Sequence, residues 1–181
     1  LERYGAEVLY AGTGSTVHGR RGGRVEKAGG WGQLLGDRGS GFDIAVHGLR
    51  HCLRIHDVEG RTIPMARAFL RELGLNSLPA LVEWAQGADK LAIARLSPIV
   101  FEAAVGEDAA DVGIILDVAA RRLAEFAGAV AHRLGFERPP VRLLGGVFVH
   151  HPLYVELFRA NLERRVPGAD VGPGLLPGCF G

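Results

Sequence analysis

A chain of 181 residues with 48% hydrophobic and 23% charged residues is long enough for one sizeable core or two small lobes. Its formal net charge of +1 gives no indication of a nucleic-acid or membrane partner. The cysteines, Cys52 and Cys179, stand far apart, which excludes a disulfide scaffold and suits a reducing compartment. We see no apolar run of membrane-spanning length and no signal peptide, so we expect a soluble cytoplasmic domain.

The two ends of the sequence suggest one domain of a larger protein, or a fragment of one. The opening residues, LERYGAEVLYAG, run almost directly into a predicted strand. The closing residues, LLPGCFG, stop on glycine without a closing element.

The first predicted elements are a strand and a hairpin. Residues 6–11, AEVLYA, form a short apolar run that ends at glycine, which is typical of a buried strand. Residues 16–20 and 23–29 are predicted to pair as a hairpin that turns at RRGG.

A block of predicted helices follows, marked by apolar residues at helical spacing and by prolines at first-turn positions. Ser40 is a good N-cap for the first of them, with Asp43 as its capping-box partner. The predicted helices cover residues 42–55, 63–73, 78–86, 89–106 (interrupted near Pro98), 108–135 and 152–166. Between the last two, residues 141–149, VRLLGGVFV, predict a buried strand with a Gly-Gly break, followed by a solvated loop at His150 and His151.

Three glycine-rich turns are candidates for ligand binding, and the first is GTGS. Its backbone N–H groups are free of side-chain bulk and can surround phosphate oxygens, with Thr13 and Ser15 adding hydroxyl donors. A plain tight turn is the alternative. The turn lacks the lysine of a Walker A motif, and it is not a GxGxxG that opens a helix.

The other two turns are AGGWG and GDRGSG. Trp31, flanked by glycines, can serve as a platform for a sugar ring, although a core position is the commoner fate of a tryptophan. Asp37 can accept hydrogen bonds from two hydroxyls of a polyol or order a metal-bound water, and the alternative role of helix cap is already filled by Ser40. The late Gly145–Gly146 pair could admit an adenine against the backbone, or mark a closely packed bulge. His47 and His51 stand four residues apart, but no third residue indicates a metal site.

The chain carries four glycine motifs in a fixed order: GTGS, GGWG, GDRGSG before a predicted helix, and LLGGVF after a long predicted helix. This ordered set is similar to the motifs of the N-acetylglucosamine kinase and BadF/BadG/BcrA/BcrD ATPase family. That family belongs to the sugar-kinase, Hsp70 and actin superfamily. The similarity runs from about residue 6 to residue 150. It implies an α/β fold: a ribonuclease-H-like, actin-type ATPase lobe with a mixed sheet, flanking helices and a helical insertion.

The resemblance also implies that the active site is divided between two lobes. Residues 1–181 would be the C-terminal lobe of a two-lobed ATP-dependent kinase, truncated at its C-terminal end. The first phosphate loop and the catalytic aspartate would belong to an N-terminal lobe upstream of residue 6. Half a cleft should not catalyse, because phosphoryl transfer depends on positioning and charge stabilisation from both sides.

Site residues carry over by position from the same resemblance. ATP contacts are expected at Gly12, Thr13, Gly14, Ala104, Gly145 and Gly146. Sugar contacts are expected at Ser15, Thr16, Gly30, Trp31, Gly32 and Asp37. No catalytic base and no metal ligand are expected within this chain.

The implied function of the complete protein is ATP-dependent phosphorylation of an amino sugar of the N-acetylglucosamine or glucosamine type, with Mg²⁺ accompanying ATP. The alternatives are a nucleotide-gated activator of a partner protein and a degenerate domain kept for structure or dimerisation. GTGS has no neighbouring cysteine that would indicate an activator's iron–sulfur cluster, which favours the kinase. A homodimer is a further expectation; nucleic acid and membrane are not expected as partners.

Overall fold

The computed structural model describes residues 6–174, with residues 6–8 described by their backbone alone. Within that range a single five-stranded sheet has the order β3-β2-β1-β4-β5. The strands are β1 Ala6–Ala11, β2 Ser15–Arg21, β3 Arg24–Gly29, β4 Pro140–Leu144 and β5 Asp170–Pro173. β1 pairs antiparallel with β2 and parallel with β4, so the sheet is mixed, as expected.

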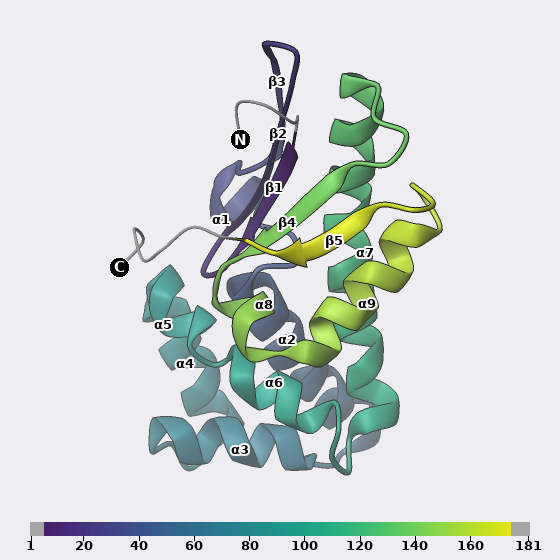
Figure 1. The fold of residues 1–181 in the computed structure, drawn as a ribbon. Coiled ribbons are helices and arrows are strands. Elements are labelled where there is room, and N and C mark those ends of the chain that lie inside the picture. Colours follow the sequence, from purple (N-terminus) through teal and green to yellow (C-terminus); the bar gives the residue numbers. More distant parts are fainter. Residues whose placement is uncertain (1–5, 175–181) are drawn as a thin grey trace.

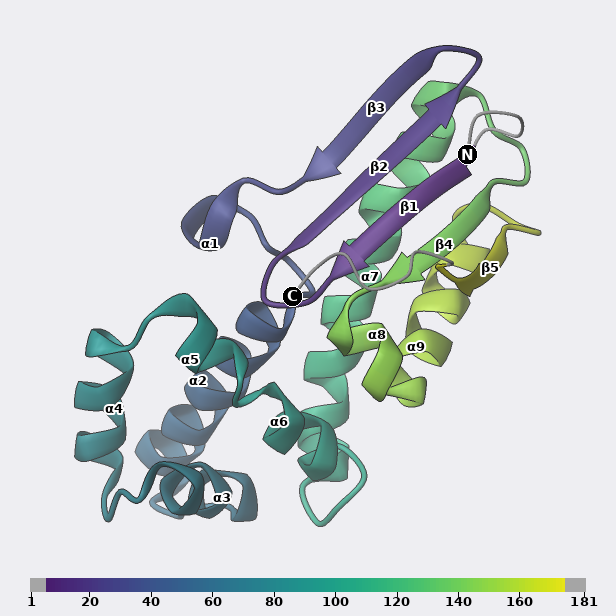
Figure 2. The same cartoon turned by 60° about the vertical axis from the view of Figure 1, so that its left-hand side comes forward.

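The predicted strand and hairpin are confirmed. β2 pairs antiparallel with β3, and the chain turns between them at Gly22 and Gly23, both with positive φ. Leu9 of β1 lies opposite Val17 of β2 and Leu143 of β4, and all three side chains are buried. The apolar run that suggested a strand therefore forms the centre of the sheet (Figure 2).

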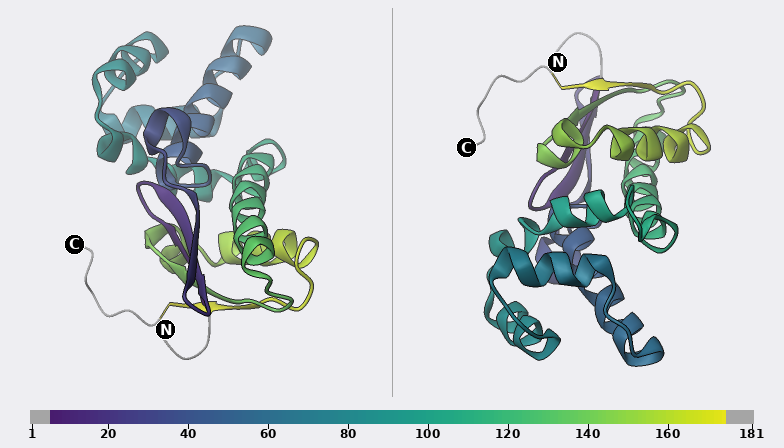
Figure 3. Two further views of the ribbon diagram at one scale, coloured as in Figure 1. Left: turned by 90° about the horizontal axis from the view of Figure 1, so that it is seen from above. Right: turned by 90° about the horizontal axis from the view of Figure 1, so that it is seen from below.

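Helices cover one face of the sheet and extend below one of its ends. The described helices are α1 Gly32–Leu35, α2 Gly41–Glu59, α3 Pro64–Leu73, α4 Leu78–Gly87, α5 Lys90–Ala94, α6 Ser97–Ala103, α7 Ala109–Leu134, α8 Gly146–His150 and α9 Pro152–Glu163. The long helix α7 packs against β1, β2 and β3, with α9 beside it (Figures 1 and 3). Among the helices of residues 6–174, none combines the length and apolarity needed to cross a bilayer.

The helical insertion runs from α2 to α6 and lies beneath the carboxyl ends of β1 and β4 (Figure 1). The predicted interruption near Pro98 is confirmed, since α5 ends at Ala94 and α6 begins at Ser97 with Pro98 in its first turn. Because ligands of open α/β sheets bind at the carboxyl ends of parallel strands, the insertion borders the edge where a site is expected.

Hydrogen bonds of the GDRGSG turn fix the start of α2. As predicted, the Ser40 hydroxyl accepts a hydrogen bond from the Asp43 N–H. The Asp43 carboxylate accepts from the Gly39 N–H at 2.8 Å, one residue before the cap that a capping box would use. The buried Tyr154 hydroxyl of α9 donates to the Gly39 carbonyl at 2.8 Å, which ties α9 to the same turn.

One predicted element needs correction, and two elements were not predicted. Residues 141–149 are not one strand: β4 ends at Leu144 and residues 146–150 form helix α8. The chain turns at Gly145, where φ is 97°. Helix α1 and strand β5 were not predicted, since both are very short and lack a clear apolar period. The closing residues 175–181, with Cys179, lie outside the described residues.

Gly145→Ala should destabilise the protein strongly. A Cβ at this position would clash with the Ala11 carbonyl oxygen, which belongs to the backbone of the central strand and cannot move aside. Because this clash adds to the strain of the positive φ, the free energy of unfolding should fall by about 3 kcal/mol or more. Urea denaturation of the variant and wild type measures it.

Gly60→Ala is the matched control for that measurement. Gly60 also has a positive φ, at the end of α2, but a Cβ there would meet nothing within 4 Å. Its cost should stay near 1 kcal/mol. Equal losses in the two variants would show that the contact with Ala11 is not the constraint.

Candidate functional site

A hollow of about 400 Å³ lies at the carboxyl ends of β1 and β4, against the insertion. Four separate chain segments meet there: the turn after β1, the start of α2, the α5–α6 junction and the start of α8. Its lining residues are Tyr10, Gly12, Thr13, Gly41, Leu91, Ala94, Arg95, Ser97, Pro98, Gly146, Val147, His150 and His151. Three residues predicted for ATP, Gly12, Thr13 and Gly146, are thereby brought to one place.

The GTGS turn presents its backbone to this hollow. The Gly12 N–H donates to the Gly14 carbonyl at 2.9 Å, and the Gly12 carbonyl accepts from the Gly41 N–H at 2.8 Å. Within residues 6–174, the N–H groups of Thr13 and Gly14 donate to no oxygen of the protein. Two adjacent free N–H donors in a glycine turn are a suitable binding site for an anion.

The Gly145–Gly146 pair, predicted to contact adenosine, packs directly on the first strand. The close approach of Gly145 to Ala11 places Gly146 and the start of α8 beside Gly12. Ala104 lies at the opposite end of α6 from Ser97 and is not among the lining residues. Its contact with adenosine stays a prediction.

Asp37 lies at the junction between the GTGS and GDRGSG turns. It has a φ of 57°, unusual for a residue with a side chain, and it is 4% exposed. One carboxylate oxygen, Oδ1, accepts from the Ser15 N–H at 3.1 Å, and the other, Oδ2, accepts from the Lys90 ammonium at 2.6 Å. A carboxylate has about four acceptor positions, so these two hydrogen bonds leave part of its acceptor capacity unused.

Gly14 and Ser15 pack closely against this carboxylate. A Cβ on Gly14 would lie 2.7 Å from Asp37 Oδ1 and 2.9 Å from Lys90 Nζ, so only glycine fits. The Ser15 side chain is buried, and its hydroxyl donates to the Arg38 carbonyl at 2.7 Å. Arg38 itself turns away and contacts the Asp43 carboxylate at 3.3 Å.

The residues predicted for the sugar other than Ser15 and Asp37 lie at the end of the hairpin and the start of α1. The Gly30 N–H donates to the Ser15 carbonyl at 3.0 Å, and a Cβ on Gly30 would lie 3.1 Å from the Thr16 hydroxyl. Trp31 is 73% exposed, with the Lys27 ammonium 5.9 Å from its ring centre. The core position that is common for tryptophan is therefore excluded, and with the adjacent Gly32 also exposed the indole is open to a ligand.

His150 and His151, which line the hollow, were predicted to form a solvated loop. This is wrong for both, because His150 belongs to helix α8 and His151 is half-buried. Its ring stacks on Phe101 with centroids 3.6 Å apart and planes 8° from parallel. Burial, followed by the nearby His150, lowers the pKa of His151 from its ordinary value of 6.5. His150 lies in α8 and is exposed.

Lys90 and the Phe101–His151 pair are the residues that sequence reasoning missed. Lys90 could have been noticed because the chain has only two lysines, Lys27 and Lys90, but nothing in the sequence places it beside Asp37. His47 contacts Asp43 at 3.6 Å. Among residues 6–174, no three His, Cys, Asp or Glu side chains gather as a metal site.

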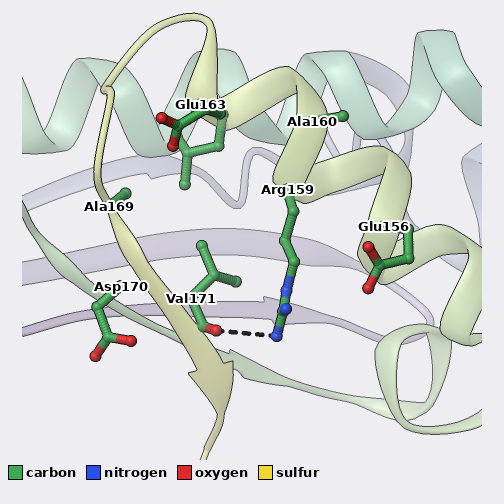
Figure 4. A pocket seen from close by; sticks show the side chains of 8 residues that line it. Glu156, Arg159, Ala160, Glu163, Ala169, Asp170 and Val171 are labelled. Atoms are coloured by element: carbon green, nitrogen blue, oxygen red, sulfur yellow. Dashed lines mark hydrogen bonds between the residues drawn. The ribbon is translucent and has the colours of Figure 1, made fainter.

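A second hollow, of about 520 Å³, lies between α9 and β5, away from the glycine turns (Figure 4). Arg159 crosses it and donates to the Val171 carbonyl at 3.0 Å. The Glu163 carboxylate accepts from the Gly168 N–H. These polar groups serve the connection between helix and strand, so we place the candidate site at the first hollow.

Comparisons with known proteins identify the same family that the sequence motifs resemble. Residues 5–173 match the model of the BadF/BadG/BcrA/BcrD ATPase family. The chain is 31% identical over 172 residues to N-acetyl-D-glucosamine kinase from Dictyostelium discoideum, covering 91% of this chain and 53% of that protein. It is also 31% identical over 176 residues to N-acetylmuramic acid/N-acetylglucosamine kinase from Clostridium acetobutylicum, covering 94% and 57%.

Solved structures show the same fold. A putative N-acetylglucosamine kinase from Chromobacterium violaceum matches with a TM-score of 0.74 and 25% identity, over 92% of this chain and 56% of that one. A second putative N-acetylglucosamine kinase, from Porphyromonas gingivalis, matches in fold with a TM-score of 0.68 and 19% identity, over 96% and 58%. The expected sugar-kinase fold is confirmed.

The chain therefore belongs to the BadF/BadG/BcrA/BcrD ATPase family. It spans just over half the length of the curated relatives that it matches.

The stacked His151 should make stability depend on pH. Because its pKa is lowered in the folded state, the unfolded chain binds a proton more readily, and stability is lost as pH falls through the ordinary value of 6.5. His151→Phe keeps a ring against Phe101 but cannot be protonated. Its melting temperature relative to wild type should rise as pH falls from about 7.5 to about 5.5. Parallel melting profiles across that range would contradict this role.

Proposed function

We propose that the complete protein transfers a phosphoryl group from ATP to a hydroxyl of an amino sugar of the N-acetylglucosamine or glucosamine type. The observation that carries this proposal is the meeting of the GTGS, GDRGSG and LLGG turns at one end of the sheet. Both curated relatives are named as kinases of N-acetylated amino sugars, which supports it. They give no comparable support to a nucleotide-gated activator.

In the proposed complex, the nucleotide occupies the hollow between Gly12 and Gly146. Its phosphates would accept hydrogen bonds from the free N–H groups of Thr13 and Gly14 and from the Thr13 hydroxyl. The adenosine would lie along Gly145 and Gly146, with Ala104 as a more distant expected contact. The start of the 19-residue helix α2 adds the positive end of its dipole at Gly41.

The sugar would lie on the other side of Asp37, nearer the hairpin. Trp31 would carry an apolar face of the ring, with Gly30 and Gly32 allowing close approach to the backbone. The unused acceptor capacity of Asp37 would take neighbouring hydroxyls, beside Ser15 and Thr16. These residues bind and orient; the group that removes the hydroxyl proton is proposed to come from the rest of the protein.

A second lobe is the proposed partner of this one. Trp31, Leu34 and Leu35 are 73%, 86% and 78% exposed beside the proposed sugar position, an apolar surface that a closing lobe would cover. Mg²⁺ is proposed to arrive with ATP, held by its phosphates, because the nearby Asp37 carboxylate is already paired with Lys90. A cytoplasmic location follows from the use of ATP, and a homodimer remains part of the proposal.

The full-length protein should release ADP from ATP in the presence of N-acetylglucosamine or glucosamine, and faster than with hexoses that lack the 2-amino group. A coupled ADP assay across a panel of hexoses and amino sugars measures this. Absence of sugar-dependent ADP release from every member of the panel would overturn the proposed function.

Trp31→Ala should raise the KM for the sugar by about tenfold or more, since the ring loses an apolar platform. Because Trp31 is exposed, the melting temperature should change little, and the KM for ATP should stay within about twofold. Steady-state kinetics with each substrate varied separately tests this division. A rise in the KM for ATP instead would place Trp31 on the nucleotide side.

Asp37→Asn should lower kcat/KM for the sugar by roughly tenfold to a hundredfold, the usual worth of a hydrogen bond to a charged group. The amide oxygen can still accept from the Ser15 N–H, and asparagine tolerates the positive φ, so the fold should persist. The amide nitrogen cannot accept from the Lys90 ammonium, so the melting temperature should fall to some extent. If the variant melts easily while its folded fraction keeps full activity, Asp37 is structural and its place in the sugar site is wrong.

A further inference from the structure

Lys90 lies directly over the GTGS turn, although it is 76 residues away from Gly14 in sequence. A Cβ on Gly14 would lie 2.9 Å from the Lys90 ammonium nitrogen, so the two groups are in contact across the bare glycine. Lys90 opens the short helix α5 of the insertion, which is capped by the Asp89 side chain. The insertion thus delivers one cation to the turn that is expected to hold phosphate.

Asp37 anchors this cation but leaves part of it accessible. The ammonium donates to Asp37 Oδ2 at 2.6 Å, which occupies one of its three N–H donors. Within residues 6–174, this is its only hydrogen bond or ion pair to the protein. The Asp37 side chain is 5% exposed and that of Lys90 is 31% exposed, so the lysine is the more accessible member of the pair.

The free donors on the turn and on the lysine are complementary. Among the described residues, 6–174, Thr13 and Gly14 have two backbone N–H groups without a protein partner, and Lys90 has two further N–H donors and a positive charge next to Gly14. Phosphate-binding loops in other folds combine backbone N–H groups with a lysine from the loop itself. GTGS carries no lysine, and here the tertiary structure places one against it.

We propose that Lys90 is a phosphate-binding residue: anchored by Asp37, it contacts the phosphate chain of the nucleotide bound at the Gly12–Gly14 turn. The inference rests on the proposed nucleotide site of the preceding section, and it adds a ligand group from the helical insertion. A purely structural Lys90, present only to neutralise the buried Asp37, would leave phosphate affinity unchanged once the fold is intact.

Calorimetric titration of the full-length protein with ATP, inorganic tripolyphosphate and adenosine tests the proposal. Lys90→Met should weaken binding of ATP and of tripolyphosphate by roughly 10- to 100-fold. Adenosine carries no phosphate, so its affinity should be unchanged, and its binding also reports that the variant is folded. Lys90→Arg, which keeps the charge, should retain most of the affinity for ATP.

Arg54→Met is the matched control. It removes one positive charge from an exposed position on α2, outside the candidate site. It should bind all three ligands as wild type does. A loss of ATP affinity equal to that of Lys90→Met would mean that overall charge, not contact, is responsible, and would overturn the proposal.

Lys90→Met leaves the buried Asp37 carboxylate unpaired, so the double variant Lys90→Met/Asp37→Asn is needed to separate stability from binding. If the double variant recovers ATP affinity, Lys90 is only a structural partner and the proposal fails. If it binds adenosine normally and still binds tripolyphosphate poorly, the phosphate contact is supported. Wild-type affinity of the single variant for ATP, within about twofold, also overturns the proposal.

The kinetic readout distinguishes this inference from the proposed function. In Lys90→Met the KM for ATP should rise, whereas Trp31→Ala should raise the KM for the sugar. A protein that phosphorylates no sugar, but whose affinity for tripolyphosphate depends on Lys90, would refute the amino-sugar assignment and keep the phosphate contact. Wild-type protein that binds neither ATP nor tripolyphosphate would overturn both.

Discussion

The arrangement of the site depends on the contact between the turn after β1 and the turn before α2. The Gly12 carbonyl accepts from the Gly41 N–H, the Ser15 N–H donates to the Asp37 carboxylate, and the Ser15 hydroxyl donates to Arg38. These bonds join the central strand to the first helix of the insertion. They require glycine at position 14, because any side chain there would meet Asp37 and Lys90.

Helices α9 and α8 are also joined to these two turns. The buried hydroxyl of Tyr154 donates to Gly39, so α9 is fixed to the turn before α2. Gly145 packs on Ala11 from the other side and brings the start of α8 against the first turn. A change at any of these positions should therefore disturb both the proposed nucleotide side and the proposed sugar side, since they share one rigid backbone junction.

The Asp37–Lys90 ion pair joins the turn before α2 to helix α5 of the insertion, beside the Arg38–Asp43 pair. The buried Asp37 carboxylate could not persist without partners, because an unpaired charge in a low-dielectric site is costly. Lys90 and the Ser15 N–H supply those partners, and within residues 6–174 the ammonium makes no further hydrogen bond or ion pair, which leaves it donors for the proposed phosphate contact. The insertion thus both stabilises the turn and adds a cation to it.

The resemblance of the ordered glycine motifs to a known family implied the fold class, and local patterns predicted most of the elements. The apolar run of residues 6–11, the RRGG hairpin, the Ser40 cap and the break near Pro98 are all local signals, set by side-chain period, turn chemistry and capping. The same locality explains the failures. Residues 146–149 have the composition of a strand, but the backbone turns at Gly145 against Ala11, a partner that local pattern does not include.

For the candidate site, the sequence alone determined that three glycine turns of a known type occur in a given order, with Trp31 and Asp37 inside them. The tertiary structure decided which of these groups meet and what state each is in. In the folded protein Trp31 is exposed, Asp37 is buried in a left-handed backbone conformation, and Lys90 lies over Gly14. The reason is physical: residue type and spacing fix local backbone preferences, whereas an ion pair across 53 residues exists only once the insertion has packed against the sheet.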